Sequence, residues 1–288
     1  MKHFLKLIRP HHYIKNLFIF LPSFFAGQIT NTTQDENSLL AFIAFSLSAS
    51  AVYILNDFND IAADQLHPKK KIRPLASGDI SKKTALSLMV LFITCGFFLM
   101  ISLSTNAAII LGLYIILNIA YSVYLKHVAI LDICIIAVGF VLRLFIGSTV
   151  TGINLSMWIV IMTFLLALFL ALAKRRDDLL LYRETGEKLR KVNDGYNLQF
   201  IDSAMMIMAS VVIVVYIIYT TSSEVVHRLN TEHLYLTALF VIIGIMRYLQ
   251  ISFVDQDSGS PTKVILNDNF IQITLCAWAL SFGWILYK

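Results

Sequence analysis

Long apolar stretches alternate with short polar ones along nearly the whole chain. Crossing about 30 Å of hydrocarbon takes a helix of roughly 20 residues, and nine stretches approach that length. They occupy residues 14–29, 38–57, 84–103, 105–124, 129–150, 156–173, 199–220, 234–253 and 270–287. Because backbone groups in lipid must be bonded within the segment, the pattern predicts an all-α polytopic membrane protein, with nine transmembrane helices around a cytosol-facing cavity.

Composition supports the same class. Hydrophobic residues make up 58% of the chain and charged residues only 14%, whereas soluble domains are about half apolar and a quarter charged. The longest polar connections, 174–198 and 254–269, are short, so residues 1–288 are expected to form a single domain. Cys95, Cys134 and Cys276 lie singly in apolar stretches, which favours neither disulfides nor a thiolate metal site.

Basic residues gather in alternate connections between the predicted helices. The 23 lysines and arginines concentrate before the first stretch, between the second and third, and from 174 to 191. Positive charge marks the cytosolic side of a membrane, so we expect a bacterial-type inner membrane protein with its amino terminus inside and its carboxyl terminus outside. The net charge of +5 requires no nucleic acid partner, and any one of these basic residues can be explained by topology alone.

Acidic residues mark the end of the second stretch, in the sequence NDFNDIAADQLHPKKKIRPLASG at 56–78. Asp57, Asp60 and Asp64 are spaced i, i+3, i+7, which places them on one face of a continuous helix. A solvated helix end is the plain explanation, but like charges on one stripe repel. A magnesium site would explain the spacing, because this ion binds carboxylate and amide oxygens together with substrate phosphate.

Basic residues follow the acidic ones directly. Pro68 disfavours helix at the residue before it and predicts a turn. The turn lets Lys70, Lys71 and Arg73 fold back toward the carboxylates. Carboxylates for a metal and basic side chains for phosphate together predict a site for a diphosphate.

Polar residues also lie inside two of the predicted helices. Arg143 follows Asp132 by eleven residues, about 16 Å along a helix, and a charge at such depth almost always faces the bundle interior. Asn118, Tyr121 and Ser122 share one face that leads to Lys126. Hydrogen bonding between helices explains these positions as well as substrate contact does.

The residues NDxxDxxxD at 56–64 resemble the first aspartate-rich motif of the UbiA-type intramembrane prenyltransferase superfamily. Ordinary members carry a second such motif between the sixth and seventh helices, where this chain reads KRRDDLLLYRETGEKLRKVNDGY with no D-x-x-x-D. The chain instead resembles one branch, the decaprenyl-phosphate phosphoribosyltransferases, from end to end in RPHHYIKNLFIFLPSFFAG, HPKKKIRPLASG, YSVYLKHVAILD, GFVLRLFIG, LALAKRRDDL and MRYLQ. His12-Tyr13 replaces that branch's usual Gln-Trp.

This resemblance implies that a polyprenyl phosphate attacks the anomeric carbon of 5-phosphoribosyl 1-diphosphate and releases diphosphate with the help of Mg2+. It implies catalytic roles for Asn56, Asp57, Asp60 and Asp64, the three aspartates being the metal ligands. The expected donor-binding residues are Lys15, Lys70, Arg73, Tyr121 and Lys126. The expected lipid-phosphate-binding residues are Arg143, Lys174, Arg175 and Arg247. The surrounding lipid and a second copy of the chain are further expected partners.

Two other functions stay open at this point. An ordinary prenyltransferase would move an isoprenoid chain onto an aromatic or haem-like acceptor. A transporter would also bury charges, but it would place its substrate near the midplane of the membrane rather than beside an acidic stripe at one face.

Overall fold

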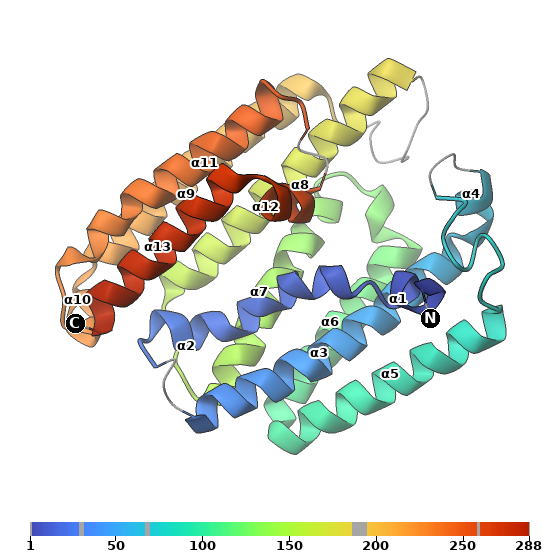
Figure 1. Ribbon diagram of the computed structural model, residues 1–288, viewed down its shortest axis with the longest axis horizontal. Helices are drawn as coiled ribbons and strands as arrows, with labels where there is room; N and C mark the ends of the chain where they lie inside the picture. Colours follow the sequence, from blue (N-terminus) through green and yellow to red (C-terminus); the bar gives the residue numbers. More distant parts are fainter. Residues whose placement is uncertain (1, 29–31, 67–69, 186–194, 258–259, 288) are drawn as a thin grey trace. The chain divides into compact units, whose positions relative to one another are not determined.

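The computed structural model describes residues 2–28, 32–66, 70–185, 195–257 and 260–287 (Figure 1). Within these ranges the regular elements are all helices. In order they are α1 (Lys2–Ile8), η1 (Pro10–Phe20), α2 (Leu21–Phe25), α3 (Thr32–Asn59), α4 (Ile61–Leu66), α5 (Lys82–Leu103), α6 (Thr105–Val123), η2 (Leu125–His127), α7 (Leu131–Thr151), α8 (Met157–Thr185), α9 (Leu198–Thr221), α10 (Ser223–Leu229), η4 (His233–Thr237), α11 (Ala238–Phe253), α12 (Pro261–Asn267) and α13 (Asn269–Tyr287).

Eight helical segments in the described ranges are long and apolar enough to cross a membrane, and they coincide with the second to ninth predicted stretches. The all-α prediction is therefore confirmed. The first predicted stretch, 14–29, is different because it begins as a 3-10 helix and continues into a five-residue α-helix. The count of nine crossings accordingly stays a prediction.

The chain divides into two compact units. Unit 1 contains residues 1–24, 28–126 and 142–154, and unit 2 contains 25–27, 127–141 and 155–288. Helix α7 contributes its first half to unit 2 and its second half to unit 1. The aspartate-rich segment and the loop that follows it belong to unit 1.

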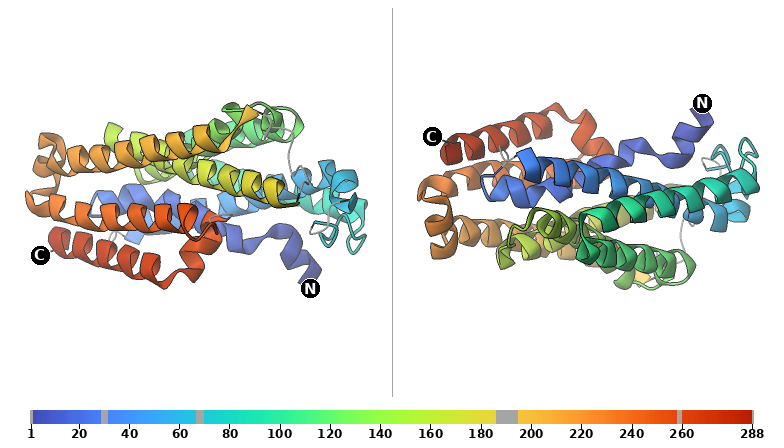
Figure 2. Two further views of the ribbon diagram at one scale, coloured as in Figure 1. Left: turned by 90° about the horizontal axis from the view of Figure 1, so that it is seen from above. Right: turned by 90° about the horizontal axis from the view of Figure 1, so that it is seen from below.

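In unit 1, α3 and α5 pack side by side (Figure 2). Alanines and serines dominate the buried positions in the middle of α3, so another helix can approach closely. A Cβ on Gly96 of α5 would come within 2.7 Å of the Ala44 carbonyl oxygen. Glycine at this position therefore permits the contact.

Segment η1 runs antiparallel to α3. Tyr13 bonds Ser50 at 2.8 Å and Asn16 bonds Ser46 at 2.9 Å, so the contacted residue number falls as η1 advances. Eleven residues of 3-10 helix extend about 22 Å, most of the ~30 Å hydrocarbon thickness. Because a 3-10 helix rises further per residue than an α-helix, this short apolar stretch can extend through most of the hydrocarbon without forming a regular α-helix.

In unit 2, α8 packs against α9, and their core is aliphatic and aromatic. Arg176 of α8 ties three helices together: its Nε bonds Asp202 of α9 at 2.8 Å, and its Nη1 bonds the Ser252 carbonyl of α11 at 2.6 Å. The carboxylate and the backbone carbonyl that accept from this buried cation therefore both lie in unit 2.

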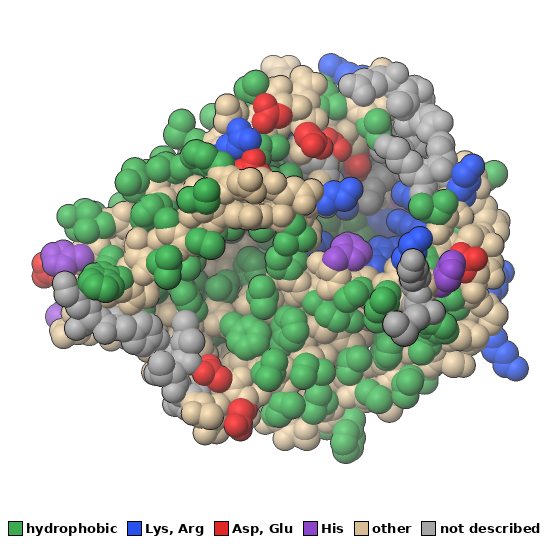
Figure 3. Space-filling view, viewed as in Figure 1, with side chains coloured by type: hydrophobic (Ala, Val, Ile, Leu, Met, Phe, Trp, Pro, Cys, Tyr) green, Lys and Arg blue, Asp and Glu red, His purple; other side chains and the backbone are tan. Residues whose placement is uncertain are grey.

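Large hydrophobic side chains are exposed on the outer faces of the long helices. Examples are Phe98 on α5, Ile109 on α6 and Leu280 on α13. Figure 3 shows hydrophobic side chains covering much of the face in view, including the region over α3 and α5. Soluble monomers rarely expose contiguous apolar surface on this scale, so these faces suit contact with lipid.

Gly147 provides a test of the packing between η1 and α7. A Cβ at this position would lie 2.0 Å from the Ile19 carbonyl oxygen, which is backbone and cannot swing away. We expect Gly147→Ala to lower the free energy of unfolding by about 1–3 kcal/mol, measured as thermal unfolding in detergent. Gly112→Ala is the control, because its Cβ would meet only the Phe97 ring at 3.7 Å. Equal melting temperatures for the two variants would contradict this packing.

Candidate active site

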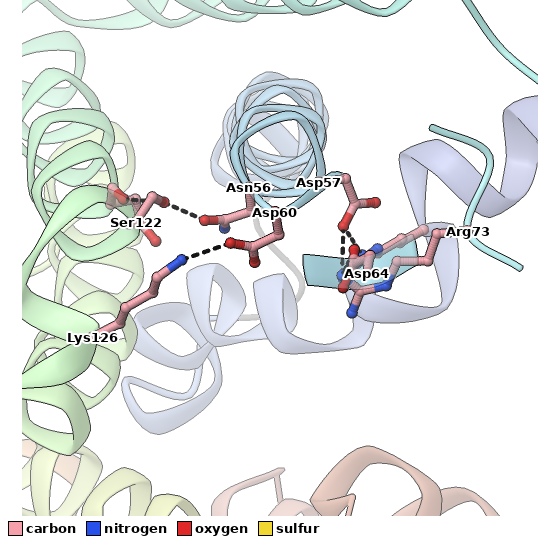
Figure 4. Close-up of polar contacts among 9 residues, drawn as sticks. Asn56, Asp57, Asp60, Asp64, Arg73, Ser122 and Lys126 are labelled. Atoms are coloured by element: carbon pink, nitrogen blue, oxygen red, sulfur yellow. Dashed lines mark hydrogen bonds and ion pairs between the residues drawn. The ribbon is translucent and has the colours of Figure 1, made fainter. Parts of the chain in front are cut away.

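The three aspartates do not share one face. Helix α3 ends at Asn59, Asp60 lies in a turn, and α4 begins at Ile61. Figure 4 shows Asp60 pointing toward Lys126, while Asp57 and Asp64 point toward Arg73. Backbone bonds of the helical i to i−4 type continue through this segment, at 3.0 Å for Asp60 and 2.8 Å for Asp64, but the Asp60 side chain has a different partner from the other two, so the three carboxylates do not form one group.

Asp57 and Asp64 converge on one guanidinium. Arg73 Nη1 lies 3.0 Å from Asp57 Oδ1 and 2.7 Å from Asp64 Oδ2. Both carboxylates are buried, Asp57 to 2% exposure. The prediction that the basic turn folds back onto the acidic residues is confirmed for Arg73, whose amide bonds the Lys70 carbonyl at 2.9 Å; for Lys70 and Lys71 it stays a prediction. Pro68, to which that turn was attributed, lies outside the described residues.

Arg9 is a second partner of Asp57. From the sequence it was expected only to mark the cytosolic side of the membrane. Its Nη2 bonds Asp57 Oδ1, and its guanidinium lies 5.3 Å from the centre of the Tyr53 ring. Arg9 has a left-handed backbone conformation, with φ of 53°, directly before Pro10 opens η1. The Arg-Pro pair at the start of an apolar stretch is the only signal in the sequence for this placement.

Helix α6 and the short segment η2 that follows it supply the partners on the other side of the aspartate segment. Lys126 Nζ bonds Asp60 Oδ1 at 2.8 Å, and the Ser122 hydroxyl bonds Asn56 Oδ1 (Figure 4). Ser122 also donates to the Asn118 carbonyl at 2.7 Å. The predicted face of Asn118, Tyr121 and Ser122 does lead to Lys126. Ser122 contacts Asn56 of α3, and Lys126 contacts Asp60 just after that helix. Tyr121 is partly buried.

The acidic residues fit a magnesium ion in part. Among the described residues, no group of three or more His, Cys, Asp or Glu side chains is arranged to hold a metal. Asp57 and Asp64, however, direct one oxygen each at a point that a cationic nitrogen occupies. Magnesium is usually bound by one or two carboxylates, waters and substrate phosphates. These two residues would hold the ion, and Asp60 in this conformation would not.

Arg143 lies in the interior of unit 1, as predicted, with 5% of its surface exposed. Its Nε donates to Asn16 Oδ1 at 2.9 Å, and its guanidinium carbon lies 4.6 Å from the centre of the Phe45 ring and 5.1 Å from that of Tyr114. Lys15 directly precedes Asn16, the residue of η1 that accepts this bond.

Arg175 does not have the placement expected of a lipid-phosphate ligand. It is 1% exposed in unit 2, and its Nε and Nη1 bond Asp132 and Asp178 at 2.6 and 2.9 Å. Tyr196 donates to the second oxygen of Asp132 at 2.5 Å and accepts from the Ile130 amide at 2.6 Å. Burial, together with the bond to Asp132, raises the pKa of the Tyr196 hydroxyl, so this group stays a donor. This network is structural.

The other two residues expected to bind the lipid phosphate also lie in unit 2. Arg247 Nη2 bonds Asp268 at 2.7 Å, and Asp268 also accepts the Ile271 amide at 2.8 Å. The hydrogen bond from Arg247 lowers the pKa of Asp268, so the carboxylate remains a partner for Arg247. Lys174 is partly buried and precedes Arg175 in α8. Arg247 thus links α11 to the start of α13, which departs from the expected role.

Arg175→Met tests the structural role. The change would leave the fully buried Asp132 without its guanidinium partner, which typically costs about 3–5 kcal/mol, so we expect a large fall in the unfolding temperature and in the yield of folded protein. Arg228→Met is the matched control, since its contact with Glu224 is 4.0 Å long and exposed and is worth less than about 1 kcal/mol. A stable Arg175→Met protein that had lost only its affinity for polyprenyl phosphate would restore the ligand role.

Comparison with known proteins agrees with this fold. Residues 17–274 match the model of the UbiA prenyltransferase family. A decaprenyl-phosphate phosphoribosyltransferase of Mycolicibacterium smegmatis is 32% identical, with 98% of this chain and 92% of that protein covered. Another, of Corynebacterium glutamicum, is 30% identical over 98% of this chain and 86% of that protein.

A UbiA homologue of Archaeoglobus fulgidus, solved with DMAPP and Mg2+, superposes with a TM-score of 0.72 at 17% identity, covering 99% of this chain and 100% of that one. At this identity the likeness establishes the fold only. The family match, which extends over most of the sequence, and the aspartate segment at the end of α3 together show that this chain is an integral membrane protein of the UbiA prenyltransferase family.

Proposed function

We propose that this chain transfers 5-phosphoribose from 5-phosphoribosyl 1-diphosphate to a polyprenyl phosphate and releases diphosphate. The observation that carries the proposal is the arrangement of charge in unit 1. Two convergent carboxylates, Asp57 and Asp64, share Arg73, and another buried cation of unit 1, Arg143, bonds Asn16 and none of these carboxylates. The two substrates present a diphosphate and two phosphate monoesters, and this requires more than one basic cluster. The names of the relatives support the same reaction.

The bond changes are simple. An oxygen of the polyprenyl phosphate forms a bond to the anomeric carbon, the bond from that carbon to the diphosphate oxygen breaks, and the diphosphate leaves with the electron pair. The second ionisation of a phosphate monoester has a pKa of about 6, so the nucleophile is already charged near neutral pH and no protein base is required. A bound divalent ion would supply neutralisation of the departing charge.

The residues divide the work as follows. Asp57 and Asp64 would hold Mg2+, and Asn56 and Asp60 would position the polar end of α3 against Ser122 and Lys126. Arg73 lies beside Asp57 and Asp64, Lys126 lies beside Asp60, and both would bind the diphosphate of the donor. We propose that Lys70 and Tyr121 also bind the donor. Arg143 and Lys174 remain candidates for the lipid phosphate. Arg175 and Arg247, which were expected in the same role, form the ion pairs of unit 2 in the free protein, so we propose a structural role for them.

The location of the site follows from the charge pattern. We place the amino terminus and the aspartate segment on the cytosolic side of a bacterial inner membrane and the carboxyl terminus outside, because basic residues gather in alternate connections. A water-soluble phosphoribosyl donor would then reach the site from the cytosol. The acceptor, whose tail is apolar, would arrive through the membrane.

The reaction is tested with purified protein, magnesium, donor labelled in ribose and a polyprenyl phosphate. We expect label in the lipid extract. Asp57→Asn and Asp64→Asn should each lower turnover by at least ~100-fold, because a positioned divalent ion stabilises developing charge by several kcal/mol. Asp79→Asn is the control: Asp79 is exposed and bonds Ser77 and His3 rather than the site.

Lys126→Met separates donor binding from chemistry. Methionine keeps much of the apolar stem and removes the charge that contacts Asp60. Losing a charge-assisted hydrogen bond to the donor should cost about 1.5–3 kcal/mol, seen mainly as a raised KM for the donor. The proposal fails if no ribose enters lipid with any of several polyprenyl phosphates, while labelled isoprene carbon is transferred from a prenyl diphosphate to an aromatic ring.

A further inference from the structure

Helices α8, α9 and α11 of unit 2 enclose a cavity with a charged wall (Figure 1). Its volume is about 430 Å³, which is large enough for a small ligand or for part of a larger one. The wall consists of Arg176, Asp202, Ser203, Met206 and Phe253. All of these residues belong to unit 2, whereas the aspartates of the candidate active site belong to unit 1.

The cavity lies at the depth of the lipid head groups. Arg176 lies just beyond the end of one apolar stretch, Asp202 lies near the start of the next, and Phe253 ends a third. Because membrane spans begin and end at the boundary of the hydrocarbon, these three residues share that boundary. Met206, one helical turn further along α9, is exposed and extends the wall toward the hydrocarbon.

Arg176 is a buried cation with a fixed orientation and a donor to spare. It is 6% exposed. Its Nε donates to Asp202 Oδ1 at 2.8 Å, its Nη1 donates to the Ser252 carbonyl at 2.6 Å, and its guanidinium carbon lies 4.8 Å from the centre of the Phe253 ring. Within the described part of the chain, its Nη2 donates no hydrogen bond. A cation oriented by its neighbours loses little freedom when it binds an anionic group.

Asp202 offers the opposite charge in the same wall. Its side chain is 38% exposed, and from the residues that the structure describes its Oδ2 accepts no hydrogen bond. The ion pair therefore presents one guanidinium donor and one carboxylate oxygen. A ligand with only negative charge would be repelled by Asp202, and one with only positive charge would be repelled by Arg176. A ligand that carries both charges matches the pair.

We propose that this cavity binds the head group of a zwitterionic, amine-bearing membrane phospholipid. The phosphate of the lipid accepts from Arg176 Nη2 and from the Ser203 hydroxyl, and its ammonium group donates to Asp202 Oδ2. Met206 and Phe253 contact the first carbons of the acyl chains. Polar pockets between membrane helices are known sites for lipid head groups. A polyprenyl phosphate lacks the amine, so this site is distinct from any acceptor site, and the inference does not depend on the proposed reaction.

Native mass spectrometry of the purified full-length chain measures lipid retention directly. The probes are phosphatidylethanolamine and phosphatidylglycerol with the same acyl chains, and we expect the wild-type chain to bind the first at least tenfold more tightly. Asp202→Asn removes the charge and keeps an acceptor for Arg176, so it should abolish this preference. Glu224→Gln makes the same change on the exposed surface of α10 and should preserve the preference.

Met206→Trp tests the cavity without changing the ion pair. The larger side chain fills part of the space, so retention of phosphatidylethanolamine should fall at least tenfold while the unfolding temperature stays the same. Met246→Trp is the matched control, because Met246 is an exposed methionine of α11 outside the cavity wall.

Soluble competitors separate a head-group site from a simple anion site. Glycerophosphoethanolamine, which has the head group without acyl chains, should displace phosphatidylethanolamine from the wild-type chain, and inorganic phosphate at the same concentration should not. Equal displacement by the two competitors would overturn the proposal. Equal affinity of the wild-type chain for the two lipids, or a wild-type preference in folded Asp202→Asn or wild-type retention in Met206→Trp, would overturn it as well.

Discussion

Arg73 places one nitrogen between Asp57 and Asp64, at 3.0 and 2.7 Å from their oxygens. Two carboxylates buried at the end of a membrane helix are costly unless cations compensate for them, and this requirement shapes the surrounding structure. It brings the loop after α4 back onto the site. It also brings Arg9 to Asp57, which fixes the start of η1 against the end of α3. The bonds from Tyr13 to Ser50 and from Asn16 to Ser46 continue this pairing along η1.

The same arrangement explains how one site can be stable without substrate and reactive with it. In the free protein Arg73 compensates for the carboxylates that would hold magnesium. Under the proposed function, a magnesium diphosphate brings both a cation for Asp57 and Asp64 and an anion for Arg73. Each charged group then exchanges one partner for another of the same sign, so the carboxylates and the guanidinium stay compensated throughout binding.

The hydrophobic pattern was sufficient to predict the long helices, because a membrane span has a required length and composition. It was not sufficient for η1, since an apolar stretch does not distinguish a 3-10 helix from an α-helix. The sequence predicted three acidic residues close together, but the local spacing could not predict that Asp60 pairs with Lys126, far along the chain, while Asp57 and Asp64 share Arg73. The buried ion pair of Arg175 was not predicted, because the sequence around an arginine does not show that its partner is Asp132, 43 residues earlier in the chain.

The most direct measurement is the paramagnetic resonance of Mn2+, used in place of Mg2+, with the purified chain and 5-phosphoribosyl 1-diphosphate. The account predicts a protein-bound manganese spectrum for the wild-type chain that disappears when either Asp57 or Asp64 is changed to Asn, while the folded fraction stays the same. An identical bound spectrum in the wild-type chain and in both variants would show that the metal is held elsewhere, and would contradict the central claim.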